Sequence, residues 1–295
     1  MSEEQLSHEM ILQRFVLWAQ QQEDIRVAFV IGSRARNNHP ADKWADLDLI
    51  FVTTNPYHYI LKADWLETFG ALWLTYVEKN NVEGIMERRA LFAGGVDVDF
   101  VPIALKDMQK FAAIDMLPLE DVLLPGVKIV LDKDNFAEII SDAREVLAQH
   151  PTLSIPPGNN EFIESIHNFW YHFYWTAKKL CRGELWSAKW CLDVHMKLLL
   201  LRMLEWYKRA MHGWDYNTWH NGRYLEEWAG SRVIEELQDA FAHYSTEDMW
   251  QALKTTQKLY RWVAKETAQL LSYTYPTRID EQVSILVTTY QTTNS

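Results

Sequence analysis

A short polar motif between two apolar runs is the feature that most constrains this chain. Residues 26–31 (Arg-Val-Ala-Phe-Val-Ile) have the β-branched and aromatic composition of a buried strand, which Gly32 ends. A second apolar run starts at Asp46-Leu47-Asp48. Because successive side chains of a strand point to opposite faces, Asp46 and Asp48 are predicted to share one face while the leucines face the core.

The two carboxylates and the turn before them predict a site for Mg²⁺ and a nucleotide. Two carboxylates held close together repel unless a cation lies between them. The turn Gly32-Ser33-Arg34 offers backbone N–H groups, a hydroxyl and close approach, which suit a phosphate. A carboxylate pair beside a phosphate-binding turn is what a Mg²⁺–nucleotide site requires. The sequence therefore favours a protein that handles a nucleoside triphosphate.

A third acidic strand follows a Gly94-Gly95 turn. Residues 96–101 (Val-Asp-Val-Asp-Phe-Val) alternate strictly, so Asp97 and Asp99 are predicted on one face. Either acidic pair alone is typical of the solvated face of an antiparallel sheet. The joint pattern, with the glycine-serine turn upstream, instead favours phosphoryl or nucleotidyl transfer, which depends mainly on positioning and charge neutralisation.

These motifs resemble those of a known family. Gly32-Ser33, Asp46-x-Asp48 and Asp99 are similar to the nucleotidyltransferase superfamily that includes DNA polymerase β. Further segments narrow the resemblance to the aminoglycoside 6-adenylyltransferases (streptomycin adenylyltransferases). They are residues 31–35 and 46–52, 127–134 (Val-Lys-Ile-Val-Leu-Asp-Lys-Asp), Phe169-Trp170, Lys178 to Glu184, and Tyr273 to Pro276. The resemblance covers nearly the whole chain.

The resemblance implies roles for particular residues. Asp46, Asp48 and Asp99 would be the catalytic acids and the ligands of Mg²⁺, with two ions expected, and ATP would be the co-substrate. Gly32, Ser33 and Arg34 would bind the nucleotide. The role of Asp97 stays open, because the family often has a non-acidic residue there.

The helical half adds two nucleotide-binding candidates. The family keeps a lysine at the position of Lys178, which directs that side chain toward the triphosphate; snorkelling at a helix end is the alternative. The family often has a Gly-Lys followed by a second basic residue where this chain reads Trp219-His-Asn-Gly-Arg223-Tyr224, so only Arg223 is a clear basic match. This departure leaves the identity of the acceptor open.

Composition limits the partners and the compartment. The net charge is −11, and residues 1–150 hold 24 Asp and Glu against 14 Lys and Arg. Such an acidic surface repels nucleic-acid phosphates and attracts polycations such as aminoglycosides. The alternative explanation of the negative charge is that it only keeps the protein soluble. With two cysteines, no leader-like N-terminus and no apolar run of about 20 residues, we expect a cytoplasmic protein that does not enter the membrane. The sequence leaves the oligomeric state open.

The fold class is predicted as α+β. A polymerase-β-like nucleotidyltransferase domain with a mixed sheet is expected over residues 1–150, and a helical bundle that binds substrate and nucleotide over 151–295, joined by a proline-rich linker at 151–160. Strands are expected at 26–31, 47–52, 88–92 and 96–101; helices are expected at 5–21, 57–80, 161–182, 185–211, 223–242 and 246–272. Ten of the fourteen tryptophans follow residue 165, and most are expected in the core.

The sequence thus predicts transfer of AMP from Mg-ATP to a hydroxyl of an aminoglycoside, with the 6-hydroxyl of streptomycin as first choice, and hence antibiotic resistance. Asp99 is expected to take the proton of the hydroxyl, with Asp193 as the other candidate base. Two alternatives remain at this stage. One is a nucleotidyltransferase of the same fold that acts on a protein or another small alcohol. The other is a non-catalytic binder of nucleotide or drug, which the intact acidic triad disfavours.

Overall fold

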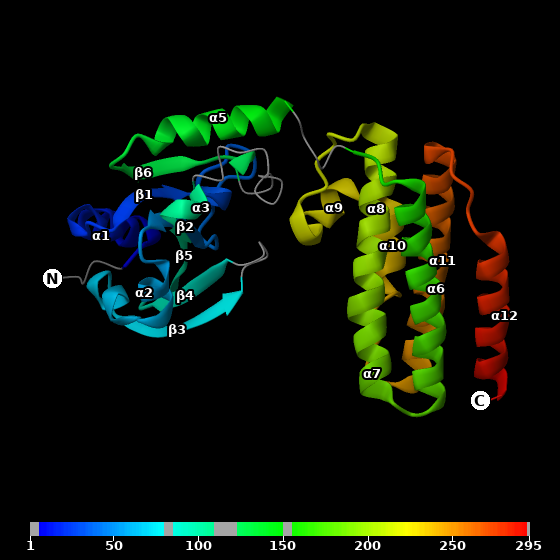
Figure 1. The fold of residues 1–295 in the computed structure, drawn as a ribbon. Coiled ribbons are helices and arrows are strands. Elements are labelled where there is room, and N and C mark those ends of the chain that lie inside the picture. The colour runs from blue at the N-terminus through cyan, green and yellow to red at the C-terminus, as the bar shows by residue number, and fades with distance from the viewer. Residues whose placement is uncertain (1–5, 80–84, 109–122, 150–154, 294–295) are drawn as a thin grey trace. The chain divides into compact units, whose positions relative to one another are not determined.

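The computed structural model describes residues 6–79, 85–108, 123–149 and 155–293 (Figure 1). It forms two compact units, Met1–Thr152 and Leu153–Ser295. The first contains a sheet with helices and the second is helical, so the predicted α+β class is confirmed. Of the expected linker, the part up to 154 lies outside the described residues, and residues 155–158 are not helical.

The first unit is built on a six-stranded mixed sheet with the order β3-β4-β5-β2-β1-β6. The central strands β2 and β5 are parallel, and the other neighbours are antiparallel. The strands are β1 (Ile25–Val30), β2 (Leu47–Thr53), β3 (Leu72–Lys79), β4 (Met86–Phe92), β5 (Val96–Ala104) and β6 (Lys128–Asp132). The helices are α1 (His8–Gln21), α2 (Pro56–Leu61), α3 (Leu105–Met108) and α5 (Phe136–Gln149).

The alternation of the central strands fills a core on each face of the sheet. Leu47, Leu49 and Phe51 pack toward α1, whose Phe15 is fully buried. Side chains of the other parity, such as Ile50, pack toward α5. Asp48 projects from the same face of the sheet as Ile50 and lies at the start of β2.

Helix α1 begins later than the sequence suggested. The Ser7 hydroxyl accepts a hydrogen bond from the Met10 N–H at 3.3 Å and so caps the helix at His8. Residue 5, where the helix was expected to begin, lies outside the described residues.

The single helix expected over 57–80 is wrong. Helix α2 ends at Leu61, a 3₁₀ turn spans Asp64–Thr68, and β3 follows. Gly70 lies between them, and a Cβ added there would lie 2.9 Å from a terminal methyl carbon of Leu6. After this glycine, the β-branched and aromatic run of β3 pairs with β4 across the antiparallel ladder.

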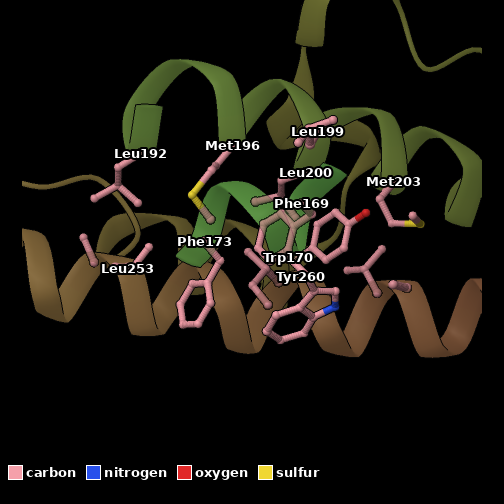
Figure 2. Packing of buried hydrophobic residues seen from close by; sticks show 14 of the residues in the cluster. Phe169, Trp170, Phe173, Leu192, Met196, Leu199, Leu200, Met203, Leu253 and Tyr260 are labelled. Carbon is pink, nitrogen blue, oxygen red and sulfur yellow. The ribbon is translucent and has the colours of Figure 1, made fainter. Parts of the chain in front are cut away.

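The second unit packs its helices around an aromatic core (Figure 2). Phe169 of α6 stacks on Tyr260 of α11 with ring centroids 3.6 Å apart, and Trp170 is 1% exposed. Most of the tryptophans after residue 165 take part in this core, as expected, whereas Trp186 and Trp190 are exposed; the buried ones are Trp170, Trp228 and Trp250, and Trp175, Trp206, Trp219 and Trp262 pack half-buried against them. The helices are α6 (Asn159–Cys181), α7 (Leu185–Trp190), α8 (Met196–His212), α9 (Leu225–Trp228), α10 (Ser231–Gln238), α11 (Thr246–Leu271) and α12 (Thr277–Thr293).

Two expected helices are interrupted. The one at 185–211 contains a π-helical turn at Cys191–His195, where the buried Lys197 ammonium donates to the Leu192 carbonyl at 3.1 Å. The one at 223–242 divides into α9 and α10 at Gly230, whose φ of 93° is outside the helical region. The elements β6, α5 and α12 were not assigned from the sequence.

No helix in the described parts of the chain is both long and apolar enough to cross a membrane. Both cysteines are free thiols: Cys191 is buried and Cys181 is half-buried.

Candidate active site

Three aspartates from two neighbouring strands converge at one end of the sheet. Asp46 immediately precedes β2, Asp48 is the second residue of β2, and Asp99 is the fourth residue of β5. Because β2 and β5 are parallel, with Asp48 in register with Asp99, the two side chains lie side by side. One carboxylate oxygen of each aspartate lies within 4.8 Å of those of the other two.

The turn after β1 brings Gly32 against Asp48. Gly32 begins a 3₁₀ turn, Gly32–Arg34, with a φ of 67°, in the left-handed region that favours glycine. A Cβ at this position would lie 2.4 Å from Oδ2 of Asp48. The Ile31 N–H also donates to the Asp48 carbonyl at 3.1 Å. Glycine is therefore required here so that the carboxylate and the turn can come into contact.

Ser33 and Arg34 have different environments within this turn. The Ser33 hydroxyl is buried and has no hydrogen-bond partner in the described structure, which is unusual for a buried polar atom. The Arg34 guanidinium donates to the carbonyls of Asp46 (2.7 Å) and Ala45 (2.6 Å). Arg34 thus holds the loop that leads into β2 and positions Asp46.

A cavity of about 270 Å³ adjoins the turn. Ser33, Arg34, Arg36 and Lys128 contribute to its wall, together with Glu9. Three cations against one carboxylate suit an anionic group such as phosphate. Sequence reasoning did not single out Arg36 or Lys128, although Arg36 lies three residues from Ser33 and Lys128 lies within a segment quoted for its family resemblance.

Burial and neighbouring charges perturb the pKa of Asp99. It is 8% exposed, and burial raises the pKa of Asp99 to about 7. Arg89 lowers this pKa, whereas the charges of Asp48, Glu87 and Asp46 raise it. With no cation bound, this carboxyl therefore titrates near neutral pH.

Arg89 of β4 was not anticipated from the sequence. Its guanidinium lies 3.0 Å from Asp99 and 2.7 Å from Glu87, and it also contacts Glu78 of β3. Burial lowers the pKa of Arg89, but the charges of Asp99 and Glu87 outweigh that effect and raise it overall. The predicted strand at 88–92 contained this residue, but only the register with β5 shows that it faces Asp99.

Asp97 lies apart from the triad, although it shares a strand face with Asp99. Its side chain is 54% exposed, and one oxygen lies 3.2 Å from Nε2 of His8 on α1. The group of acids whose oxygens converge contains Asp46, Asp48 and Asp99 and does not include Asp97.

The remaining candidates belong to the second unit. Lys178 is exposed near the end of α6, with its ammonium 4.9 Å from the centre of the Tyr174 ring. Arg223 is exposed just before α9. Asp193 forms an ion pair with Lys189 at 2.5 Å, and its other carboxylate oxygen is buried with no hydrogen-bond partner among the described residues. Glu184 pairs with Lys179 and Arg182 at the end of α6.

The triad is chemically suited to Mg²⁺. This ion prefers oxygen ligands and is usually held by one or two carboxylates together with substrate phosphates and water. Three convergent carboxylates, a buried unpaired hydroxyl at Ser33 and a glycine turn that leaves room beside Asp48 meet that preference. When bound, the ion would neutralise phosphate charge and lower the pKa of an attacking hydroxyl.

A convergent acidic triad next to a glycine-serine turn on a mixed sheet is the arrangement expected of a nucleotidyltransferase. Comparison with known proteins agrees with this class and identifies the family within it. The model of the streptomycin adenylyltransferase family matches residues 5–290, and the chain belongs to this family. The resemblance inferred from the sequence is therefore confirmed, as is its assignment to the aminoglycoside adenylyltransferase enzymes.

Individual relatives are similar over most of their length. An aminoglycoside 6-adenylyltransferase of Bacillus subtilis (strain 168) is 24% identical over 92% of this chain and 93% of its own. One from Campylobacter jejuni is 27% identical over 88% and 87% of the two chains. A crystal structure of an aminoglycoside 6-adenyltransferase from Bacillus subtilis aligns over 97% of this chain and 99% of its own, with a TM-score of 0.47 and 20% identity.

Proposed function

We propose that this protein transfers AMP from Mg-ATP to a hydroxyl of a cationic aminoglycoside, with the 6-hydroxyl of streptomycin as the acceptor. The observation that carries the proposal is the convergence of Asp46, Asp48 and Asp99 beside the Gly32 turn. Family membership and relatives named as aminoglycoside 6-adenylyltransferases support the choice of acceptor.

In the proposed reaction, the hydroxyl oxygen forms a bond to the α-phosphorus of ATP. The bond from that phosphorus to the oxygen bridging to the β-phosphate breaks, and pyrophosphate leaves. Asp99 accepts the hydroxyl proton, a role that its position beside Asp46 and Asp48 supports. Asp193 remains the alternative base, although its ion pair with Lys189 favours a structural role.

The binding roles follow from charge and position. Asp46, Asp48 and Asp99 would hold Mg²⁺, with two ions proposed. Gly32 and Ser33 would receive the phosphates, and Arg34 would support the loop between them and Asp46.

Lys178 and Arg223 are proposed as contacts of the second unit to the nucleotide. Both are exposed cations, complementary to a triphosphate and repelled by a cationic sugar. We accordingly propose that residues 1–150 form the nucleotidyltransferase domain and that residues 151–295 contribute to substrate and nucleotide binding.

A panel of acceptors tests this proposal. The protein is incubated with Mg²⁺, ATP labelled at the α-phosphate, and streptomycin, other aminoglycosides, simple alcohols or a mixture of proteins. Label transferred to streptomycin, together with release of pyrophosphate, is the expected result. Label transferred only to proteins or simple alcohols would overturn the acceptor, and the absence of pyrophosphate release with every acceptor would overturn catalysis. Asp48→Asn serves as the inactive control.

A further inference from the structure

Arg89 lies in a row of side chains that crosses the sheet at the acidic triad. The ladder pairs Tyr76 of β3 with Arg89 of β4, Arg89 with Asp99 of β5, and Asp99 with Asp48 of β2. Paired residues of neighbouring strands project from the same face. Arg89 is thus the direct neighbour of Asp99 on the side away from Asp48.

The guanidinium of Arg89 is held by two acids besides Asp99. Glu87, two residues earlier on β4, accepts hydrogen bonds from Nε (3.0 Å) and from a terminal nitrogen (2.7 Å), and its side chain is 7% exposed. Glu78, which pairs with Glu87 across the ladder, binds Nε from β3. The planar fork of Arg89 is therefore fixed from two sides, and the remaining nitrogen lies 3.0 Å from Oδ2 of Asp99.

This contact restricts the carboxylate without using all of its capacity. A carboxylate has two oxygens and about four lone-pair directions, so one bond from Arg89 leaves room for a metal ion. It also balances charge, since the guanidinium contacts Asp99, Glu87 and Glu78, and Asp46 and Asp48 lie next to Asp99. Lysine would keep the charge but has one nitrogen, so it cannot hold the same three partners in a planar fork.

We propose that Arg89 is a positioning residue that holds the Asp99 carboxylate in the orientation in which it binds a divalent cation. Glu87 and Glu78 orient Arg89 in turn. This inference rests on the proposed function for its catalytic consequence, but the metal site itself can be tested without ATP or acceptor.

The test measures binding of Mn²⁺ alone to the metal-free protein by calorimetry and by electron paramagnetic resonance. Arg89→Lys keeps the charge and removes the fork, and it is expected to weaken Mn²⁺ binding at least fivefold and to lower kcat at least tenfold. In an Asp99→Asn background the same replacement is expected to change Mn²⁺ binding by less than twofold, because the residue acts through Asp99. Arg26→Gln, which removes an ion pair with Asp134 outside the acidic cluster, is the matched control and should bind Mn²⁺ normally.

Two results would overturn the proposal. If Arg89→Lys binds Mn²⁺ with wild-type affinity, only the charge of Arg89 matters and its planar fork does not. If Arg89→Lys weakens Mn²⁺ binding as much in the Asp99→Asn background as in the wild type, Arg89 does not act through Asp99.

If Arg89→Lys does not fold, Glu78→Gln carries the test. It should weaken Mn²⁺ binding more than Asp97→Asn, which removes the same charge from the same sheet face, and equal effects would refute the inference. If the metal results hold while no aminoglycoside is modified, the proposed function fails and the role of Arg89 stands.

Discussion

Replacing Asp99 by asparagine is expected to stabilise the metal-free protein, and to do so more at pH 8 than at pH 5. Burial raises the pKa of Asp99 from 3.8 to about 7 in the folded protein. Between about pH 4 and pH 7 the folded state therefore holds a proton that the unfolded state has lost. Stability is greatest below the unfolded pKa and falls as the pH rises through the folded pKa. Asparagine has no proton to lose and avoids this penalty.

The size of the effect follows from the two pKa values. They differ by about three pH units, and each unit corresponds to ~1.4 kcal/mol, which gives a ceiling of about 4 kcal/mol. Water reaches the cluster, since the Arg89 side chain is 40% exposed, so screening reduces the expected gain at pH 8 to about 2 kcal/mol. At pH 5 the gain should be smaller by about 1 kcal/mol or more, because folded Asp99 is still protonated there.

The assay is urea unfolding in the presence of a chelator at pH 5, 6, 7 and 8. Hydrogen exchange in β2 and β5 assigns the transition to the first unit. Asp97→Asn is the matched control, since it removes an exposed carboxylate from the same strand and should not reproduce the trend. Unchanged stability of Asp99→Asn at pH 8, or an equal gain from Asp97→Asn, would refute the reasoning.

Three further perturbations test the site. Gly32→Ala places a Cβ 2.4 Å from Asp48 Oδ2 at a φ of 67°. It should lower the free energy of unfolding, measured by thermal unfolding, by at least about 1–2 kcal/mol and should weaken Mn²⁺ binding. Wild-type stability together with wild-type Mn²⁺ affinity would contradict this geometry. Asp99→Asn should lower turnover by about two orders of magnitude or more, while Asp97→Asn keeps most of it; equal losses in rate assays would place both acids at the metal. Lys178→Ala should raise the KM for ATP and leave the affinity for streptomycin unchanged. If calorimetry instead shows that streptomycin binding is lost, Lys178 contacts the acceptor and not the nucleotide.

Much of the first unit could be predicted because its information is local. Apolar alternation identified the strands that carry Asp48 and Asp99, and the motif around Gly32 identified the turn. The convergence of the three aspartates was predicted by resemblance and is present in the structure. The expected helix over 57–80 was wrong because its apolar residues suited either period, and the strand over Leu72–Lys79 forms by pairing with β4.

What the sequence did not yield depends on register and long-range packing. The Gly94-Gly95 turn between the expected strands at 88–92 and 96–101 is compatible with a hairpin, but only the register of the β4–β5 ladder brings Arg89 to Asp99. The π-helical turn at Cys191–His195 likewise adjoins the buried Lys197, whose ammonium also donates to Thr256 of α11 at 2.8 Å. Such contacts depend on strand register and on packing between helices, which one sequence does not reveal.

The most direct test of the account is mass spectrometry of streptomycin after incubation with the protein, ATP and Mg²⁺. The account predicts a product heavier by one AMP less one water, with the adenylyl group on the 6-hydroxyl by tandem fragmentation and NMR. Asp48→Asn should give no product. Streptomycin recovered unmodified, while the same preparation adenylylates a different acceptor, would contradict the proposed function.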